Sequence, residues 1–353
     1  MLRSIRSSIR VLALLVILGL QSTFAFAADI QRTVFPLERN GIQLFLERYQ
    51  TTDAGEKKPI LLVHGLTYSS HEFDVNYGDY SLARFLASNG YAVWLLDIAG
   101  YGRSQKVEDG FMPNSDYAAE DIAAAAKRVT EISKTAKLDV LGWSWGTVTS
   151  GRFAAKYPEL VNRLVLFAPI VVGPLPEPVE VAEPFNVNTW EGAAGDFQVK
   201  ADGSIDYDIV ERPVADTFLS NCWRYDGDGS PNGGRRDILR DPTVRLIPTA
   251  DIQAPTLMIV GDKDPLATVE RCKEALKTLR EGKLEVIEGA AHAMLMEKPY
   301  YKKFQANVLA FLTSTPSKPV EKSSDSGCNV VGLGTSVVSV AALASLYRMN
   351  KTR

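Results

Sequence analysis

Short apolar runs alternate with amphipathic stretches over residues 32–312 of this 353-residue chain. A mostly parallel sheet covered by helices on both faces has this pattern, because its strands are buried while its helices are apolar on one side only. We therefore predict an α/β fold with a mostly parallel, doubly wound sheet. The predicted strands are residues 42–48, 60–63, 92–96, 138–141, 164–167, 256–260 and 284–287. The predicted helices are residues 81–89, 117–133, 145–156, 269–279 and 300–312.

The alternation is interrupted between residues 170 and 248 by closely spaced prolines and by a segment rich in Gly, Asp and Asn at residues 226–234. This interruption is too long for a plain loop, so we predict an inserted cap over residues 170–248. The core domain then consists of residues 32–169 and 249–312. Aromatic residues of the cap either line a pocket or form the small core of the cap, and we expect the second role for most of them. They are Phe185, Trp190, Phe197, Phe218 and Trp223.

The N-terminus carries basic residues, then an apolar run at residues 11–20, then the small-residue site Ala25-Phe26-Ala27. This pattern is typical of a secretory signal peptide, which we assign to residues 1–27. An uncleaved N-terminal anchor is the alternative. The signal peptide predicts export to the periplasm or the cell surface.

The C-terminal end begins with polar residues 313–327, whose Ser, Thr, Pro and Lys content predicts a linker. Residues 328–353 then contain an uncharged apolar stretch followed by basic residues, which is a candidate membrane segment. This arrangement resembles the tripartite sorting tails of some bacterial surface proteins. We expect it to anchor the chain to a membrane, and a terminal helix docked on the domain is the alternative.

The charges nearly balance, with 39 basic and 42 acidic residues and a net charge of -3. The chain therefore has no basic field that would attract nucleic acid. Three cysteines are too few for a disulfide framework, so the core must hold the fold. Cys222 and Cys272 either form a bridge or are two separate buried thiols, and the third cysteine is Cys328. The number of subunits stays open.

The sequence Gly142-Trp143-Ser144-Trp145-Gly146 lies between a predicted strand and a predicted helix. A side chain at either glycine would collide with neighbouring backbone in such a tight turn. The turn is expected to hold the serine hydroxyl above the sheet edge in strained backbone, at the N-terminus of the helix. Ser144 is therefore the candidate nucleophile.

A serine hydroxyl becomes an effective nucleophile only when a base takes its proton, and the chain has three histidines. His292 follows the last predicted strand and is the candidate base. His64, at the end of an early strand, is expected to shape a loop, and His71 is expected to lie in a solvated loop. A carboxylate must orient the base, and Asp262 and Asp264 both follow the preceding predicted strand.

Two backbone amides are candidates for stabilising negative charge on a substrate oxygen. One belongs to Trp145, directly after the serine, and the other belongs to Leu66 or Thr67, after an early strand. Tyr68 and Trp143 are the candidate contacts to substrate. This set of residues requires neither a metal nor a cofactor.

Residues 32–312 resemble the α/β-hydrolase fold superfamily, of the serine esterase and lipase kind. The resemblance lies in five segments in a fixed order, namely His64-Gly65, residues 97–104, residues 142–146, residues 261–264 and residues 289–292. It implies the order serine, acid, histidine, with Asp264 as the acid and the amide after His64-Gly65 in the oxyanion hole. Residues 97–104 are expected to form a structural turn. The tryptophans on either side of Ser144 depart from the smaller residues common in the family and are expected to narrow the acyl pocket.

The expected activity is hydrolysis of carboxylic esters through an acyl-enzyme on Ser144, with a small, medium-sized or lipid-like ester as substrate. Amide or peptide hydrolases of the aminopeptidase kind, carbon-carbon bond hydrolases and perhydrolases share the fold and stay alternatives. Epoxide and haloalkane hydrolases use an aspartate nucleophile, so a serine at position 144 disfavours them. An alternative of another class is a catalytically idle surface binding module, because a fold does not guarantee an activity.

Overall fold

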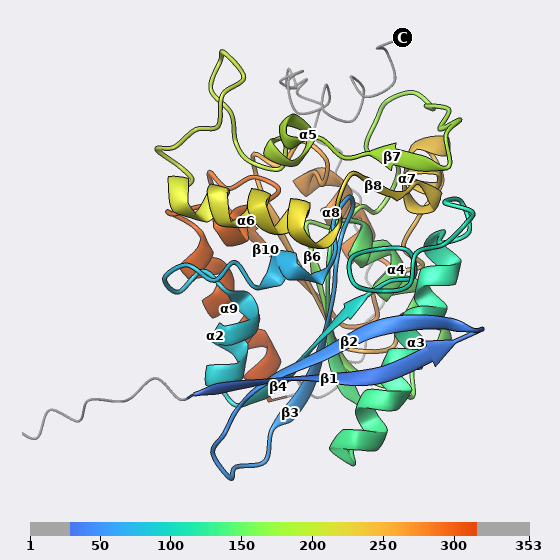
Figure 1. Ribbon diagram of the computed structural model, residues 1–353, viewed down its shortest axis with the longest axis vertical. Coiled ribbons are helices and arrows are strands. Elements are labelled where there is room, and N and C mark those ends of the chain that lie inside the picture. The colour runs from blue at the N-terminus through green and yellow to red at the C-terminus, as the bar shows by residue number, and fades with distance from the viewer. Residues whose placement is uncertain (1–28, 316–353) are drawn as a thin grey trace, which may run out of the picture.

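The computed structural model describes residues 29–315, and an eight-stranded sheet runs through the middle of this part of the chain (Figure 1). The strand order is β1-β2-β4-β3-β5-β6-β9-β10. Pairings of β1 with β2 and of β2 with β4 are antiparallel, and all the other pairings are parallel. The strands are β1 (Ile30–Arg39), β2 (Ile42–Thr51), β3 (Lys58–Val63), β4 (Tyr91–Asp97), β5 (Leu138–Trp143), β6 (Val161–Phe167), β9 (Thr256–Gly261) and β10 (Gly282–Ile287). The predicted mostly parallel sheet is confirmed.

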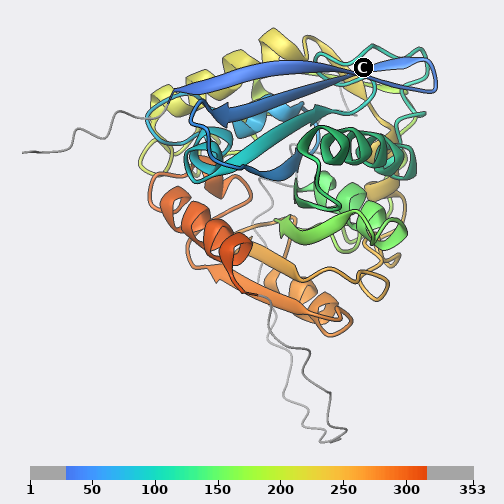
Figure 2. The same cartoon turned by 90° about the horizontal axis from the view of Figure 1, so that it is seen from below.

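Helices cover both faces of the sheet, as a doubly wound fold requires. In Figures 1 and 2, α2 and α9 lie on one face, while α3 and α4 lie on the other. Because both faces are covered, every residue of β4 and β5 is buried, which explains their continuous apolar runs. The bounds of these four helices and of α8 are α2 (Leu82–Ser88), α3 (Ser115–Ser133), α4 (Trp145–Lys156), α8 (Val269–Leu276) and α9 (Tyr301–Thr313).

Strand β1 was not predicted from the sequence. It forms a hairpin with β2 through Asn40 and Gly41, which both have positive φ, at 53° and 78°. Such a pair is the usual two-residue turn between antiparallel strands, because both positions need left-handed backbone. The hairpin closes one edge of the sheet, far along the strand order from β9 and β10.

The segment between β6 and β9 contributes no strand to the main sheet. Its elements lie together above one end of the sheet (Figure 1). They are β7 (Phe185–Val187), α5 (Trp190–Ala194), α6 (Arg212–Tyr225), β8 (Gly229–Pro231) and α7 (Gly233–Arg240). The end they cover is the carboxyl end of the parallel strands, because Arg235 and Asp226 bond to the loops after β3 and β4. We refer to residues 170–248 as the cap.

Two of the five cap aromatics behave as expected and three do not. Phe197 and Phe218 are buried and pack edge to face, with ring centroids 5.4 Å apart. Phe185, Trp190 and Trp223 are exposed, so they do not belong to a buried cap core, and the expectation of that role for most of the five residues was wrong. The α6 face that points toward the sheet uses Phe218 rather than Trp223, because these residues lie five positions apart and face different directions.

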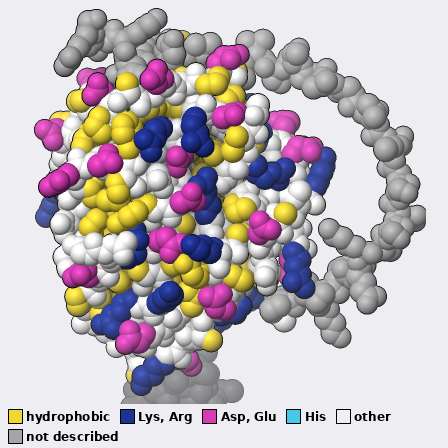
Figure 3. Space-filling model, turned by 90° about the vertical axis from the view of Figure 1, so that its right-hand side faces the viewer, with side chains coloured by type: hydrophobic (Ala, Val, Ile, Leu, Met, Phe, Trp, Pro, Cys, Tyr) yellow, Lys and Arg dark blue, Asp and Glu magenta, His cyan; other side chains and the backbone are white. Residues whose placement is uncertain are grey.

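The two described cysteines, Cys222 and Cys272, are separate buried thiols rather than a disulfide. The predicted signal peptide and sorting tail, and nearly all of the predicted linker, lie outside the described residues. Within residues 29–315 no helix is long and apolar enough to cross a membrane. On the face seen in Figure 3, acidic and basic side chains are mixed among apolar ones, in line with the nearly balanced charge.

Candidate active site

Ser144 lies at the sharp turn between β5 and α4, with φ of 56° and ψ of -120°. The chain can turn so tightly because it has glycines two residues before and after the serine. A Cβ on Gly142 would fall 2.2 Å from the carbonyl oxygen of Gly146, and one on Gly146 would fall 2.3 Å from that of Val63. The collision predicted for these positions is therefore present, and it leaves only glycine there.

His292 and Asp264 form a buried pair at the carboxyl ends of β10 and β9. His292 Nδ1 lies 2.8 Å from Asp264 Oδ2, and Asp264 Oδ1 accepts bonds from the amides of Leu266 and Ala267 at 2.8 and 2.9 Å. The carboxylate thus fixes the proton on Nδ1 and leaves Nε2 as an acceptor. Asp262 instead accepts a bond from the Gly289 amide at 2.6 Å, so Asp264 is the partner of the histidine.

Trp143 brings the histidine loop beside the serine. Its indole Nε1 donates to the carbonyl oxygen of His292 at 3.1 Å, and the two rings lie 5.9 Å apart. Trp143 also stacks on Phe167, with ring centroids 5.4 Å apart, so the indole is fixed from behind. No hydrogen bond joins Ser144 Oγ to His292 among the described residues, and such contacts in unliganded hydrolases commonly tighten only when substrate binds.

Carboxylates around His292 favour its charged form. Burial lowers the pKa of His292, but the charge and hydrogen bond of Asp264, together with Asp196 and Glu297, raise it above its ordinary value. Glu297, which sequence analysis missed, is fully buried and accepts a bond from the Ala291 amide at 3.1 Å. Burial raises the pKa of Glu297 to about 7. This residue ties down the backbone just before the histidine.

The loop after β3 packs directly against the serine. A Cβ on Gly65 would lie 3.0 Å from Ser144 Cβ, and the Gly65 amide is already bound by Glu72 Oε1 at 2.8 Å. The next amide, of Leu66, and the amide of Trp145 donate to no other residue in the described part of the chain. Two N–H groups on either side of Ser144 are therefore available to a substrate oxygen.

Residues 58–299, well over half of the chain, match the family described as the alpha/beta hydrolase fold. The chain belongs to the α/β-hydrolase fold family. Its strand order, its sharp turn at Ser144 and its buried His292-Asp264 pair agree with that membership.

Relatives of this α/β hydrolase include esterases and serine hydrolases. It is 26% identical to pimeloyl-[acyl-carrier protein] methyl ester esterase of Neisseria meningitidis over 259 residues, which cover 70% of this chain and 90% of the relative. It is 30% identical to human serine hydrolase BPHL over 131 residues, covering 36% of this chain and 40% of the relative. The chain spans less than half the length of the serine hydrolase relatives that it matches.

Solved structures share the fold of this α/β hydrolase at low sequence identity. Esterase EaEST from Exiguobacterium antarcticum aligns with a TM-score of 0.57 at 17% identity, covering 80% of this chain and 100% of the esterase. A hydrolase from Pseudomonas aeruginosa aligns with a TM-score of 0.59 at 18% identity, covering 80% of this chain and 99% of that structure.

His64 holds the serine-side loop of this α/β hydrolase, in agreement with the expected role. The Ile98 amide donates to His64 Nε2 at 3.1 Å, so the proton lies on Nδ1, which bonds the Gly65 carbonyl oxygen at 2.9 Å. Burial lowers the pKa of His64, which keeps the ring neutral. His64 is thus a positioning residue behind Gly65 and Leu66.

The expectation of a solvated His71 was wrong. The side chain is 3% exposed, and its Nε2 lies 2.8 Å from Asp226 Oδ2 of the cap. The ring also stacks on Tyr225, with centroids 5.5 Å apart. A polar loop in sequence became a buried one because the cap covers it.

Of the two predicted substrate contacts, Trp143 supports the histidine loop as described above. Tyr68 is buried and packs edge to face on Phe218 of α6, with centroids 6.1 Å apart.

Two polar cap residues near the site were missed by sequence analysis, Arg235 and Asp196. Arg235 Nη2 donates to Thr67 Oγ1 at 2.7 Å, and Thr67 is the residue that follows Leu66. No group of His, Cys, Asp and Glu within residues 29–315 is suited to hold a metal.

Proposed function

We propose that this α/β hydrolase cleaves carboxylic esters through an acyl-enzyme on Ser144. Ser144 Oγ attacks the ester carbonyl carbon while His292 Nε2 takes the hydroxyl proton, and Asp264 stabilises the imidazolium that forms. The tetrahedral intermediate collapses, and the alcohol leaves with the proton from Nε2. Water then attacks the acyl-enzyme in the same manner and releases the acid and the free serine.

The observation that carries this proposal is the buried His292-Asp264 pair beside a serine that has two unoccupied backbone amides around it. The negative charge that develops on the carbonyl oxygen would be met by the amides of Leu66 and Trp145, which need not reorganise during the reaction. Trp145 lies at the N-terminus of α4, where the helix dipole also favours negative charge. Relatives named as esterases support an ester, rather than another acyl compound, as substrate.

The nucleophile is tested by labelling with a fluorophosphonate and by substitution. Ser144→Ala should abolish labelling and lower kcat for ester hydrolysis at least about 1,000-fold. Its thermal unfolding midpoint should stay nearly unchanged. The matched control is Ser150→Ala, a buried serine one to two turns along α4 whose hydroxyl has no partner within the described residues. A folded Ser144→Ala protein that keeps near wild-type turnover would refute the assignment, and unlabelled wild-type protein would favour the idle binding module.

The bond class is tested with p-nitrophenyl esters of graded chain length beside aminoacyl anilides. The proposal expects kcat/KM for the preferred ester to exceed that for every anilide, because p-nitrophenol is a better leaving group than an aniline. A higher kcat/KM for an anilide than for all the esters would assign the protein to the amide hydrolases instead.

A further inference from the structure

A guanidinium is buried between the cap and the serine-side loop without a carboxylate to neutralise it. Arg235 is 6% exposed, and no Asp or Glu in the described part of the chain forms an ion pair with it. Its two hydrogen bonds go to neutral oxygens, from Nε to Asn232 Oδ1 at 3.0 Å and from Nη2 to Thr67 Oγ1 at 2.7 Å. These bonds use two of five N–H donors and leave the positive charge unpaired. A buried charge in this state is costly unless a counter-ion arrives.

Arg235 is tied to the two loops that surround Ser144. Thr67, its partner, follows the Leu66 amide that is available to the substrate oxygen. The preceding residue, Gly234, packs on the indole of Trp145, where a Cβ would fall 2.4 Å from the ring. Contacts on both sides therefore tie this guanidinium to the two loops that surround Ser144.

Asp196 of the cap is the carboxyl group whose charge acts on Arg235, but it does not neutralise the guanidinium. Burial raises the pKa of Asp196 to about 7, while the positive charges of His292 and Arg235 oppose that rise. The group is therefore within electrostatic range of both the base and the guanidinium, yet it is only partly ionised near neutral pH. The phenols of Tyr68 and Tyr101, which also face Arg235, stay neutral because burial raises their pKa values.

We infer that Arg235 binds a carboxylate of the substrate, so that the preferred esters are acid-bearing esters such as half-esters of dicarboxylic acids. The inference rests on the proposed ester hydrolysis and names its substrate class. A carboxylate can take two parallel N–H bonds from the donors that remain on the guanidinium. Such a ligand supplies the missing counter-ion at a fixed distance from the scissile carbonyl, which also orients the ester for attack.

The test compares acid-bearing esters with neutral esters of the same length in wild-type protein. Monoethyl glutarate, adipate and pimelate are paired with the diethyl esters and with ethyl pentanoate, hexanoate and heptanoate. Acetate esters of short hydroxy acids are paired with propyl and butyl acetate, so that the carboxylate is tried on the alcohol side as well. We expect at least one acid-bearing ester to exceed its neutral partner in kcat/KM by about 10- to 100-fold.

Arg235→Gln should remove this preference, so that the ratio of kcat/KM between each acid-bearing ester and its neutral partner falls to about one, mainly through a higher KM for the acid-bearing esters. Arg235→Lys should keep part of the preference, because it retains the charge without the planar fork. The matched control is Arg236→Gln, the next residue of α7, whose guanidinium packs 4.3 Å from the Phe111 ring. This control should leave the preference unchanged.

A binding measurement separates failure of this inference from failure of the proposed function. Calorimetry should show that wild-type protein binds glutarate or adipate, the products of the half-esters, more tightly than the matching diols, and that Arg235→Gln weakens this binding at least tenfold. This binding result would support the inference even if none of the esters were hydrolysed or the variant were less stable. Equal kcat/KM for acid-bearing and neutral esters throughout the panel, or dicarboxylate binding that survives Arg235→Gln, would overturn it.

Discussion

Ser144 is held in a backbone conformation that a residue with a side chain avoids. Its φ of 56° and ψ of -120° cost on the order of 1–3 kcal/mol relative to ordinary backbone. The surrounding bonds hold the turn: the Ser144 amide donates to the Phe167 carbonyl oxygen at 3.0 Å, and the Thr147 amide donates to the Ser144 carbonyl oxygen at 2.9 Å. This backbone conformation places the hydroxyl at the tip of the turn, where it faces the Gly65 loop.

The pH dependence of the reaction should follow His292. The imidazole must be neutral to accept the serine proton, so kcat/KM should fall as pH decreases through its pKa. Because Asp264 and the other carboxylates raise that pKa above 6.5, the acid limb should lie above pH 6.5. Asp264→Asn removes the largest of the raising effects, so its limb should move to lower pH, and its plateau should fall about 10,000-fold.

A pH profile of kcat/KM for one ester checks this expectation. Asp262→Asn is the control, because Asp262 bonds the turn amide of Gly289 and pairs with Lys263 rather than with the histidine, so this variant should leave the limb in place. If Asp264→Asn titrated at the wild-type pH, the histidine would not be responding to this carboxylate.

The residues of the site differ in how far sequence alone could predict them. Ser144 and His292 stand in local patterns, at a glycine-flanked turn and after the last strand, so their positions follow from short-range rules. His71 and Arg235 depend on partners far along the chain, at Asp226 and Thr67. Their burial is set by how the cap folds back on the core, and no nearby residue signals it.

Among the elements, the parallel strands were predictable because burial on both faces makes them apolar throughout. Strand β1 was missed because its residues alternate between exposed and half-buried positions on an edge. The signal that could have found it is the Asn40-Gly41 turn. Strand β5 was predicted although it contains a charged residue. Asp139 lies at a buried position near the start of the strand, away from Ser144.

Asp139→Asn should stabilise the protein at neutral and alkaline pH. Burial raises the pKa of Asp139 from 3.8 to about 6, so the folded state favours the protonated carboxyl, and its ionisation opposes folding. The stability that wild type has below pH 4 is therefore lost progressively as pH rises from about 4 to about 6, and the loss is complete above that range. The amide carries no charge and can still accept the Asn162 bond, so the variant should gain about 1–3 kcal/mol at pH 8 and almost nothing at pH 4.

Urea unfolding at the two pH values measures the difference. Asp251→Asn, at an exposed position, serves as the control and should change neither value. A stabilisation of the same size at pH 4 and pH 8 would show that the effect does not come from ionisation of Asp139.

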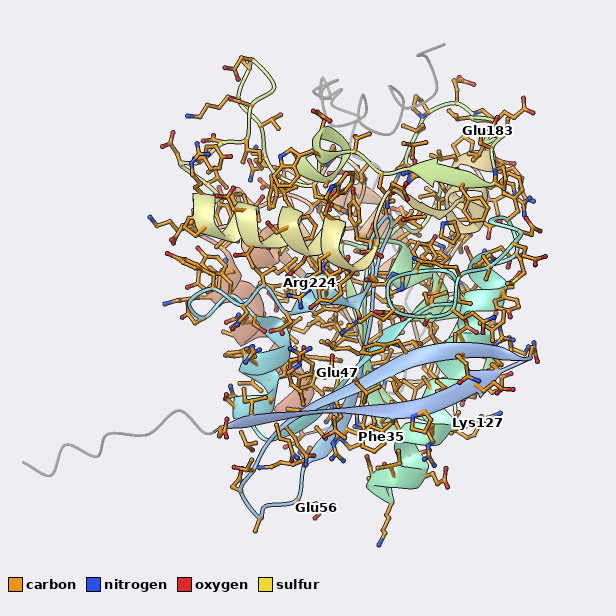
Figure 4. All side chains as sticks on the ribbon, in the orientation of Figure 1. Phe35, Glu47, Glu56, Lys127, Glu183 and Arg224 are labelled. Atoms are coloured by element: carbon orange, nitrogen blue, oxygen red, sulfur yellow. The ribbon has the colours of Figure 1, made fainter. Side chains whose placement is uncertain are left out.

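At the scale of the whole molecule, the cap and the core are joined by buried polar contacts as well as by apolar packing. Side chains fill the space between α6 and the sheet (Figure 4). Asp226, just after α6, accepts bonds from the Gly102 amide at 3.0 Å and the Ser69 amide at 3.2 Å, besides pairing with His71. One cap carboxylate thus fixes the loops after β3 and β4, on which the Leu66 amide and the Arg235 contact depend.

Asp226→Ala should destabilise cap and core together. The substitution leaves two buried amides without an acceptor and His71 with neither ring nitrogen bonded, since Nδ1 already lacks a partner within the described residues. The free energy of unfolding should fall by about 3 kcal/mol or more. Asp228→Ala, an exposed aspartate in the same turn, should have little effect.

Because the cap contacts are shared with the core, denaturant unfolding of Asp226→Ala followed by tryptophan fluorescence should remain one transition at a lower midpoint. Two separate transitions, with the core outlasting the cap, would show instead that the cap folds as an independent unit.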